Sequence, residues 1–330
     1  MNCGIGSTES VRCHNSRPDP FSFARARARR TPPIGPQRLD RPVISVGNLA
    51  AGGRGKTPVV EHVARLLLAA GERPAILSRG YGRRDRAPGA VVVGDGARVL
   101  AGLDVAGDEP LMLARAVPRA IVVVCEDRRV AGALAERHLG ATVHVLDDGF
   151  QHWAVARDID LVLVSPDDLT ARAFPFGPLR ESPRALAYAD AVIVDTDTTG
   201  GMFGVRRSLR PPALPDGQTW TPDRGPVVAL AGIARPARFR DALEAAGWRV
   251  AELVAFRDHH RYTSRDVARV NATARRAGAA GIVTTAKDAV RLPEGAAWAA
   301  PLAVARLEAE VTPGDRFRAW LLERLAEARR

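Results

Sequence analysis

A glycine-rich turn that ends in a lysine and a threonine is the first segment of this chain with residues suited to chemistry. It reads GGRGKT over residues 52–57, follows an apolar run at residues 43–46 and opens a helical pattern. Backbone N–H groups of such a P-loop converge on phosphate oxygens, its lysine reaches the β and γ phosphates, and its threonine hydroxyl binds Mg²⁺. The chain departs from the motif GxxxxGK[ST] at the first glycine, where Ala50 stands. The predicted nucleotide-binding residues are Ala50, Ala51, Gly52, Gly53, Arg54, Gly55, Lys56 and Thr57.

Lysine is rare in the chain, because only Lys56 and Lys287 are lysines among 48 Lys and Arg residues. An ammonium group is a compact point charge that a guanidinium does not reproduce in a tight pocket. We therefore interpret Lys56 as a phosphate contact. Lys287 follows a second apolar run, at residues 281–284.

Two adjacent carboxylates, Asp147 and Asp148, follow the apolar run at residues 143–146. In P-loop proteins an aspartate at a strand end holds magnesium directly or through water, and either residue fits that role. The C-terminal edge of a parallel sheet is also where ligands of such folds bind. A helix cap or a turn is the alternative interpretation.

Two further polar clusters stand next to predicted helices. Asp108 and Glu109 begin one helix, at the end where the helix dipole favours negative charge, so a plain cap is an alternative to a catalytic role. Asp258, His259 and His260 lie in a loop before another helix. Idle surface histidines and a weak metal site are the alternatives there.

The elements that must position these residues alternate between short β-branched runs and helical patterns. Apolar strands separated by helices predict an α/β fold, P-loop NTPase-like, with a parallel sheet covered by helices. Strands are expected at residues 43–46, 75–78, 120–124, 143–146, 159–164, 191–194, 227–231, 249–254, 281–284 and 302–305. Helices are expected at residues 58–70, 109–117, 128–139, 237–246, 264–277 and 314–328.

A proline-rich passage at residues 209–226 interrupts this alternation and predicts a domain linker. We expect a flexible basic arm at residues 1–41, a P-loop core at residues 42–208 and a smaller α/β domain at residues 209–330. The last helix of the chain can pack back on the core.

Composition narrows the class of protein. Hydrophobic residues make up 46% and charged residues 26% of the 330 residues, as in ordinary globular proteins, and no apolar run is long enough to cross a bilayer. The net charge of +11 indicates an anionic partner. Nucleic acid is disfavoured as that partner, because aromatic residues make up only 5% and no nucleic-acid-binding module stands out. Three cysteines, two of them in the arm, disfavour a disulfide framework and favour a reducing cytoplasm.

Taken in their order along the chain, the polar blocks resemble the tetraacyldisaccharide 4'-kinases, or lipid A 4'-kinases. Besides the P-loop, the resemblance is carried by SVGNL (45–49), LSRGYG (77–82), GDEP (107–110), DDGFQH (147–152), GPLRE (177–181) and DHH (258–260). It implies ATP-dependent phosphorylation of the 4' hydroxyl of a tetraacylated glucosamine disaccharide 1-phosphate, with Mg²⁺ as cofactor. The implied place is the cytoplasmic face of the inner membrane, bound peripherally without a transmembrane segment.

The resemblance also implies roles for single residues. Lys56 and Thr57 match the nucleotide and magnesium residues of the family, and Asp108 matches its proposed catalytic base. His259 matches the histidine that assists the base, with the adjacent His260 as the alternative. The remaining matches are Asp147 and Asp148 as metal and active-site acids, with Asp147 taken as the metal ligand, and Glu109 and Arg128 near the reaction centre or the lipid phosphate.

Two departures from the family and one competing function remain. An arginine-rich segment with Phe21 and Phe23 stands where the family has an apolar or amphipathic start. It binds an anionic membrane surface, is a solvated tail, or results from an overcalled start codon. The second departure is the stretch before Gly177, which is shorter here than in many members of the family.

A P-loop switch or GTPase that acts through a protein partner is the alternative function. It requires the guanine-reading motif Asn-Lys-x-Asp, whereas Lys287 and Asp288 are adjacent. The sequence does not indicate an oligomeric state.

Overall fold

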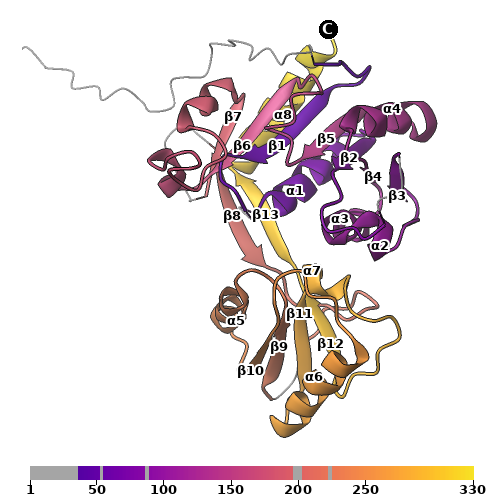
Figure 1. Ribbon diagram of the computed structural model, residues 1–330, viewed down its shortest axis with the longest axis vertical. Helices are drawn as coiled ribbons and strands as arrows, with labels where there is room; N and C mark the ends of the chain where they lie inside the picture. The colour runs from indigo at the N-terminus through magenta and orange to yellow at the C-terminus, as the bar shows by residue number, and fades with distance from the viewer. Residues whose placement is uncertain (1–35, 53–54, 86–88, 196–202, 222–224) are drawn as a thin grey trace, which may run out of the picture.

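The protein contains two β-sheets. The structure is a computed structural model that describes residues 36–52, 55–85, 89–195, 203–221 and 225–330. The nine-stranded sheet has the order β13-β8-β7-β6-β1-β5-β2-β4-β3 and the four-stranded sheet the order β10-β9-β11-β12. Figure 1 shows them as two lobes joined by the long strands β8 and β13.

The nine-stranded sheet is parallel except at its two edges, where β3 runs antiparallel to β4 and β13 antiparallel to β8. The four-stranded sheet is parallel throughout. The larger sheet contains β1 (Val43–Asn48), β2 (Pro74–Ser78), β3 (Val91–Asp95), β4 (Ile121–Val124), β5 (Val143–Asp147), β6 (Ile159–Val164), β7 (Ala191–Val194), β8 (Phe203–Leu209) and β13 (Leu307–Thr312). The smaller contains β9 (Val227–Ala231), β10 (Val250–Ala255), β11 (Gly281–Thr285) and β12 (Leu302–Ala305). The predicted α/β class with parallel strands is confirmed.

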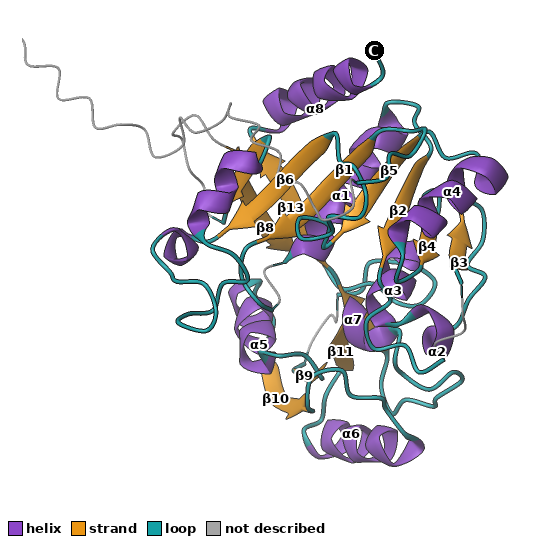
Figure 2. Ribbon diagram, turned by 45° about the horizontal axis from the view of Figure 1, so that its top comes forward, coloured by secondary structure: helices purple, strands orange, loops and turns teal. Residues whose placement is uncertain are grey.

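Helices cover both faces of the large sheet (Figure 2). The α-helices are α1 (Lys56–Ala69), α2 (Leu103–Ala106), α3 (Asp108–Ala116), α4 (Arg128–Leu139), α5 (Pro236–Ala245), α6 (Ser264–Arg276), α7 (Ala286–Ala289) and α8 (Gly314–Ala328), and the 3-10 helices are η1 (Pro166–Leu169) and η2 (Pro183–Tyr188). The core under α1, α3 and α8 takes Ile44 and Val46 from β1, whereas the core under α4 takes Val43. This alternation follows from the two-residue period of a strand, which sends successive side chains to opposite faces.

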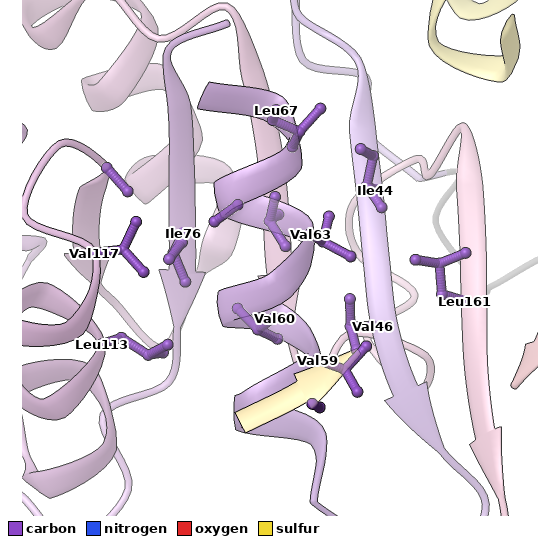
Figure 3. Packing of buried hydrophobic residues seen from close by; sticks show 14 of the residues in the cluster. Ile44, Val46, Val59, Val60, Val63, Leu67, Ile76, Leu113, Val117 and Leu161 are labelled. Atoms are coloured by element: carbon purple, nitrogen blue, oxygen red, sulfur yellow. The ribbon is translucent and has the colours of Figure 1, made fainter. Parts of the chain in front are cut away.

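Helix α1 is fixed to the sheet by one apolar stripe. Val59, Val63 and Leu67 are four residues apart, Val60 precedes Val63 by three, and all four side chains are fully buried. Figure 3 shows them packed between the strands and α3. Because the stripe holds the whole helix, the N-terminus of α1 has a fixed position at the C-terminal edge of the sheet, next to the end of β1.

Local sequence sets the ends of the helices that carry site residues. The Asp127 side chain accepts the backbone N–H of Arg129 at 2.9 Å and so caps α4, which ends at Gly140 in the left-handed conformation. Thr263 and Asp266 form a reciprocal capping box at the start of α6. The loop that holds the two histidines is thereby tied to a defined helix end.

The chain crosses between the lobes twice, through β8 outward and through β13 back. These strands pair antiparallel over six residue pairs, with ion pairs from Arg206 to Glu310 and from Arg210 to Glu308 along their faces. Helix α8 then buries Phe317 and Leu321 in the core of the large sheet. The sequence analysis predicted no strand at β3, β8 or β13. It placed residues 209–226 in a linker and residues 209–330 in the smaller domain, whereas β13 belongs to the large sheet.

In the part of the chain that the structure describes, no helix is both long enough and apolar enough to span a bilayer.

Candidate active site

The predicted phosphate-binding turn lies between the end of β1 and the start of α1. Gly52 and Gly55 have φ of +103° and +69°, which glycine adopts without the strain that a side chain would cause. A Cβ atom on Gly55 would also lie 2.8 Å from Nε of Arg207. Ala50 is buried, Ala51 is exposed and Thr57 is half-buried at the cleft, while Gly53 and Arg54 fall outside the described residues.

Lys56 spans the space between this turn and the end of β5. Its Nζ donates to Asn48 Oδ1 at 2.9 Å and pairs with Asp148 Oδ1 at 3.2 Å. Asn48 in turn donates from Nδ2 to the Ala50 carbonyl at 3.0 Å. The ammonium is therefore held at the open side of the turn, where a phosphate chain on the backbone N–H groups would meet it.

The adjacent carboxylates Asp147 and Asp148 have opposite electrostatic environments. Burial, reinforced by the charges of Glu109 and Asp148, raises the pKa of Asp147 to about 7. Burial also opposes ionisation of Asp148, but Lys56 and Arg180 outweigh it and lower the pKa of that carboxyl. Arg180 Nη1 lies 2.9 Å from Asp148 Oδ2. Asp148 is thus already paired with two cations, whereas Asp147 has too little positive charge nearby to offset its burial.

Arg128 and Glu109 flank Asp147 from two helices. Arg128 is the first residue of α4 and is buried, and its Nε has no hydrogen-bond partner among the described residues. Burial lowers the pKa of the Arg128 guanidinium despite the opposing effect of Asp147. The arrangement concentrates one buried cation and two acids at the cleft, which favours binding of a charged ligand.

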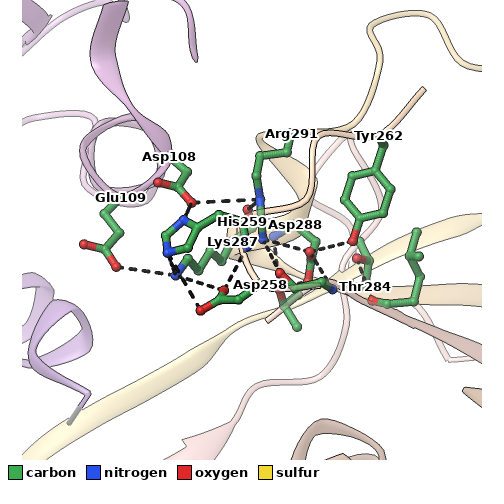
Figure 4. Close-up of polar contacts among 12 residues, drawn as sticks. Asp108, Glu109, Asp258, His259, Tyr262, Thr284, Lys287, Asp288 and Arg291 are labelled. Atoms are coloured by element: carbon green, nitrogen blue, oxygen red, sulfur yellow. Dashed lines mark hydrogen bonds and ion pairs between the residues drawn. The ribbon is translucent and has the colours of Figure 1, made fainter. Parts of the chain in front are cut away.

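Asp108 and His259 join the two lobes. His259 Nδ1 lies 2.7 Å from Asp108 Oδ2, although the residues are 151 positions apart in the sequence (Figure 4). Burial opposes ionisation of Asp108, but the hydrogen bond with His259 and the charges of Lys287 and Arg291 outweigh it and lower the pKa of the carboxyl. The hydrogen bond with Asp108 raises the pKa of His259. Asp108 lines a small hollow, whereas His259 lines both this hollow and the main cleft.

Backbone strain marks two of these positions. Asp148 and His259 have φ of +55° and +58°, and they are the non-glycine residues with positive φ in the described ranges of the chain. Such conformations cost about 1 to 3 kcal/mol and persist where the surrounding structure fixes them, often at functional sites.

Lys287 is a site residue that the sequence analysis singled out without giving it a role. Its Nζ lies 3.4 Å from His259 Nε2, 3.6 Å from Glu109 Oε1 and 3.7 Å from Asp258 Oδ1. An ammonium has only donors, so this contact favours the tautomer in which Nε2 is unprotonated and Nδ1–H donates to Asp108. The scarcity of lysine in the sequence was the signal that pointed to this residue.

A buried network under α7 holds Lys287 in place. Asp288 accepts hydrogen bonds from Tyr262 Oη at 2.6 Å, from the backbone N–H of Gly232 at 2.9 Å and from Arg291 Nη2 at 2.8 Å. The carboxylate is fully buried and faces its own lobe. Lys287 and Asp288 therefore do not form the guanine-reading pair that the GTPase alternative required.

His260 has a different environment from His259. Its ring stacks on Phe256 with centroids 4.6 Å apart, and its Nε2 lies 3.1 Å from Asp266 Oδ2, the acid of the capping box. Of the two histidines, His259 is the one that contacts Asp108.

One large cleft between the lobes collects most of the predicted site residues. The predicted residues that line it are Ala51, Gly52, Gly55, Lys56, Thr57, Glu109, Arg128, Asp147, Asp148 and His259, and Lys287 lines it as well. In the part of the chain that the structure describes, no group of three or more His, Cys, Asp or Glu side chains could by itself hold a metal ion. The geometry places the predicted phosphate-binding turn and the His259 imidazole on the same cleft, and Asp108 contacts that imidazole from an adjoining small hollow.

Comparisons with known proteins agree with this geometry. A sequence model of the family described as tetraacyldisaccharide-1-P 4'-kinase (LpxK) matches residues 21–326. The tetraacyldisaccharide 4'-kinase of Syntrophus aciditrophicus is 40% identical over 323 residues, covering 88% of this chain and 86% of the relative. That of Geobacter metallireducens is 43% identical over 272 residues, covering 78% and 80%. The crystal structure of LpxK from Aquifex aeolicus in complex with ATP is similar with a TM-score of 0.73 at 28% identity, covering 88% of this chain and 91% of that chain.

Proposed function

The chain belongs to the tetraacyldisaccharide-1-phosphate 4'-kinase family, and from this premise we propose how its residues divide the work of the reaction. The activity is ATP-dependent phosphorylation of the 4' hydroxyl of a tetraacylated glucosamine disaccharide 1-phosphate, a step of lipid A biosynthesis. The observation that carries the residue roles is that Lys56 and His259 line one cleft between the lobes, and that Asp108 is within hydrogen-bond distance of His259.

The nucleotide-binding residues are proposed to be those of the turn at residues 50–57. Its glycine conformations and the start of α1 direct N–H groups toward a phosphate chain, and Lys56 supplies the positive charge beside it. Phosphoryl transfer requires alignment and charge neutralisation more than covalent chemistry from the protein. A fixed ammonium between Asn48 and Asp148 meets that requirement.

Thr57 and Asp147 are proposed to hold Mg²⁺. The raised pKa of Asp147 indicates a buried carboxylate that lacks compensating positive charge, as expected for a residue that holds a cation. Because Mg²⁺ in kinases takes most of its ligands from phosphates and water, one carboxylate and one hydroxyl are sufficient protein ligands. Bound there, the metal would neutralise charge on the transferred phosphoryl group.

Asp108 is proposed as the catalytic base, with His259 as its partner at the cleft. The 4' oxygen bonds to the γ phosphorus, the bridging oxygen leaves with ADP, and the hydroxyl proton passes to the pair. The lowered pKa of Asp108 keeps the carboxylate ionised, and its hydrogen bond orients the imidazole. Lys287 positions His259, while Glu109, Arg128 and Asp148 are proposed to support the reaction centre or bind the lipid phosphate.

The enzyme is proposed to act as a peripheral protein at the cytoplasmic face of the inner membrane. Its acylated substrate resides in a bilayer, and the net charge of +11 favours an anionic surface. The basic arm at residues 1–41 is proposed to add to that attraction, and only residues 36–41 of it are described. The P-loop core and the small α/β lobe are proposed to act as separate domains, with β13 and α8 packed on the core, and the cleft between the lobes supports this division.

The test is an assay of the full chain with γ-labelled ATP, Mg²⁺ and the tetraacyl disaccharide 1-phosphate in detergent. We expect a labelled bisphosphate whose new phosphate is at the 4' position. Lys56→Ala is expected to abolish most of the turnover, whereas Arg240→Ala, which removes an exposed pair with Asp241, serves as the matched control. Label at another position, or no product from folded protein, would refute the assignment.

A further inference from the structure

A turn between η1 and η2 carries two exposed phenylalanines. Phe174 and Phe176 are 81% and 80% exposed, the largest fractions among the large hydrophobic side chains of the described residues. Figure 1 draws the segment between β6 and β7, which contains this turn, at an edge of the large lobe. Two such rings on one turn need an explanation, because exposed apolar patches on soluble proteins commonly mark interaction sites.

The exposure of the rings is built into a rigid turn. The Phe174 N–H donates to the Leu179 carbonyl at 2.7 Å, the Phe176 N–H to the Ala173 carbonyl at 3.0 Å, and the Leu179 N–H to the Arg172 carbonyl at 3.2 Å. A Cβ atom on Gly177 would lie only 2.2 Å from the Arg172 oxygen, so the turn requires glycine there. The fully buried Leu179 anchors it to the core. The backbone therefore holds both rings outward.

The same turn is bonded directly to the phosphate-binding turn. The Ala51 N–H donates to the Pro178 carbonyl at 2.9 Å, and the Arg180 N–H donates to the Leu49 carbonyl at 2.6 Å. Pro178 and Arg180 line the cleft, whereas Phe174 and Phe176 do not. The rings thus lie outside the cleft, on a segment whose position relative to the nucleotide site is fixed.

The charges beside the rings favour an anionic partner. Residues 171–184 contain Arg172, Arg180 and Arg184 against the single acid Glu181, and all three arginines are exposed. Arg180 pairs with Asp148 at the cleft, so the arginines of this segment that count toward a membrane contact are Arg172 and Arg184. Exposed rings on a segment with exposed arginines fit the boundary of an anionic bilayer, where rings enter the acyl region and guanidinium groups stay among the headgroups.

We propose that the turn at residues 172–180 is a membrane-docking element that inserts Phe174 and Phe176 into an anionic bilayer. This rests on the proposed function and adds where the enzyme touches the membrane. Its occupant is bilayer lipid and not the acyl chains of bound substrate, because neither ring lines the cleft. Docking here would hold the cleft near the membrane, because Pro178 and Arg180 of the same turn line it, so that the disaccharide of a membrane-bound substrate could reach the γ phosphate.

The test measures cosedimentation of the full chain with sucrose-loaded vesicles of phosphatidylglycerol and phosphatidylcholine. We expect Phe174→Ser/Phe176→Ser to lower the partition coefficient at least about tenfold, the size expected for withdrawing two rings from an apolar phase. The loss is expected to persist at high salt, where attraction by arginines is screened. Val99→Ser/Leu100→Ser, which alters two other exposed apolar residues beside the edge strand β3, is the matched control and is expected to bind as the wild type does.

Two further measurements separate this proposal from its alternatives. Turnover in detergent micelles is expected to stay unchanged in the double serine variant, so a failure of docking is distinguishable from a failure of the kinase assignment. A raised KM in micelles with unchanged vesicle binding would instead mean that the rings contact substrate chains, and would overturn the proposal. Phe176→Trp is expected to shift its emission to the blue with vesicles and to be quenched by brominated lipid. No shift, or equal binding to pure phosphatidylcholine, would contradict it.

Discussion

Replacing Asp147 by Asn is expected to stabilise the nucleotide-free protein at alkaline pH. The carboxylate is buried beside Glu109 and Asp148, and these surroundings raise its pKa from 3.8 to about 7. Because the folded state binds a proton that the unfolded state has already released, the free energy of unfolding falls as the pH rises between these two values. Asparagine does not titrate, so the variant escapes this loss.

The magnitude follows from the shift, at about 1.4 kcal/mol for each pKa unit. Over the whole window the loss is on the order of 4 kcal/mol, and between about pH 5 and about pH 8 it is about 2 to 3 kcal/mol. The advantage of Asp147→Asn over the wild type is therefore expected to grow by that amount between these two pH values. Effects of the amide on packing are present at both pH values and cancel in the difference.

Urea unfolding followed by tryptophan fluorescence at the two pH values measures this difference. Asp148→Asn is a matched control of opposite sign, because the pKa of Asp148 is lowered and its carboxylate is stabilised by Lys56 and Arg180. That variant is expected to be destabilised at both pH values, because its own stabilisation is lost only as the pH falls toward the folded-state pKa. The destabilisation is expected to be smaller at the higher pH, because removing the Asp148 charge also lowers the pKa of Asp147. An equal effect of Asp147→Asn at both pH values would refute the reasoning.

Three further predictions concern the cleft. Lys56→Arg is expected to lower kcat at least about a hundredfold although the charge is kept, because the larger planar group does not fit the lysine position; near-normal turnover would contradict the point-charge role. His259→Gln is expected to lower kcat by about 10² to 10⁴, whereas His260→Gln is expected to lower the melting temperature with little change in kcat, and the reverse pattern would exchange their roles. Lys287→Met removes a positive charge that lowers the pKa of His259, so the pKa of the imidazole is expected to rise in the variant. The acid limb of the pH profile of kcat/KM is therefore expected to move to higher pH, and an unmoved limb would exclude the contact with His259.

Elements with a buried local pattern could be predicted from the sequence. The helices at residues 128–139 and 314–328 and the strands at residues 159–164 and 227–231 have their predicted bounds. Strands β8 and β13 could not be found in this way. Their faces carry arginine and glutamate residues that pair across about 100 positions of sequence, so each strand depends on a partner that periodicity does not reveal.

The site residues likewise fall into local motifs, which the sequence reveals, and contacts between distant parts of the chain, which it does not. The turn at residues 52–57 and the paired acids are local motifs, each with a physical reason to bind phosphate or metal. That Asp108 and His259 belong together came only from the family resemblance, because the contact is made across the two lobes. The contrast between the pKa values of Asp147 and Asp148 depends on burial and on Lys56, Glu109 and Arg180, none of which the strand pattern could reveal.

The most direct test of the central claim compares kcat and the ATP dissociation constant of Asp108→Asn with those of the wild type. If Asp108 acts as the catalytic base and does not bind ATP, kcat is expected to fall by about 10²- to 10⁴-fold. The ATP dissociation constant is then expected to stay within about twofold of the wild-type value. A group that acts only in the transition state does not contribute to ATP binding in the ground state. Unchanged kcat, or a loss of ATP affinity as large as the loss of turnover, would contradict the account.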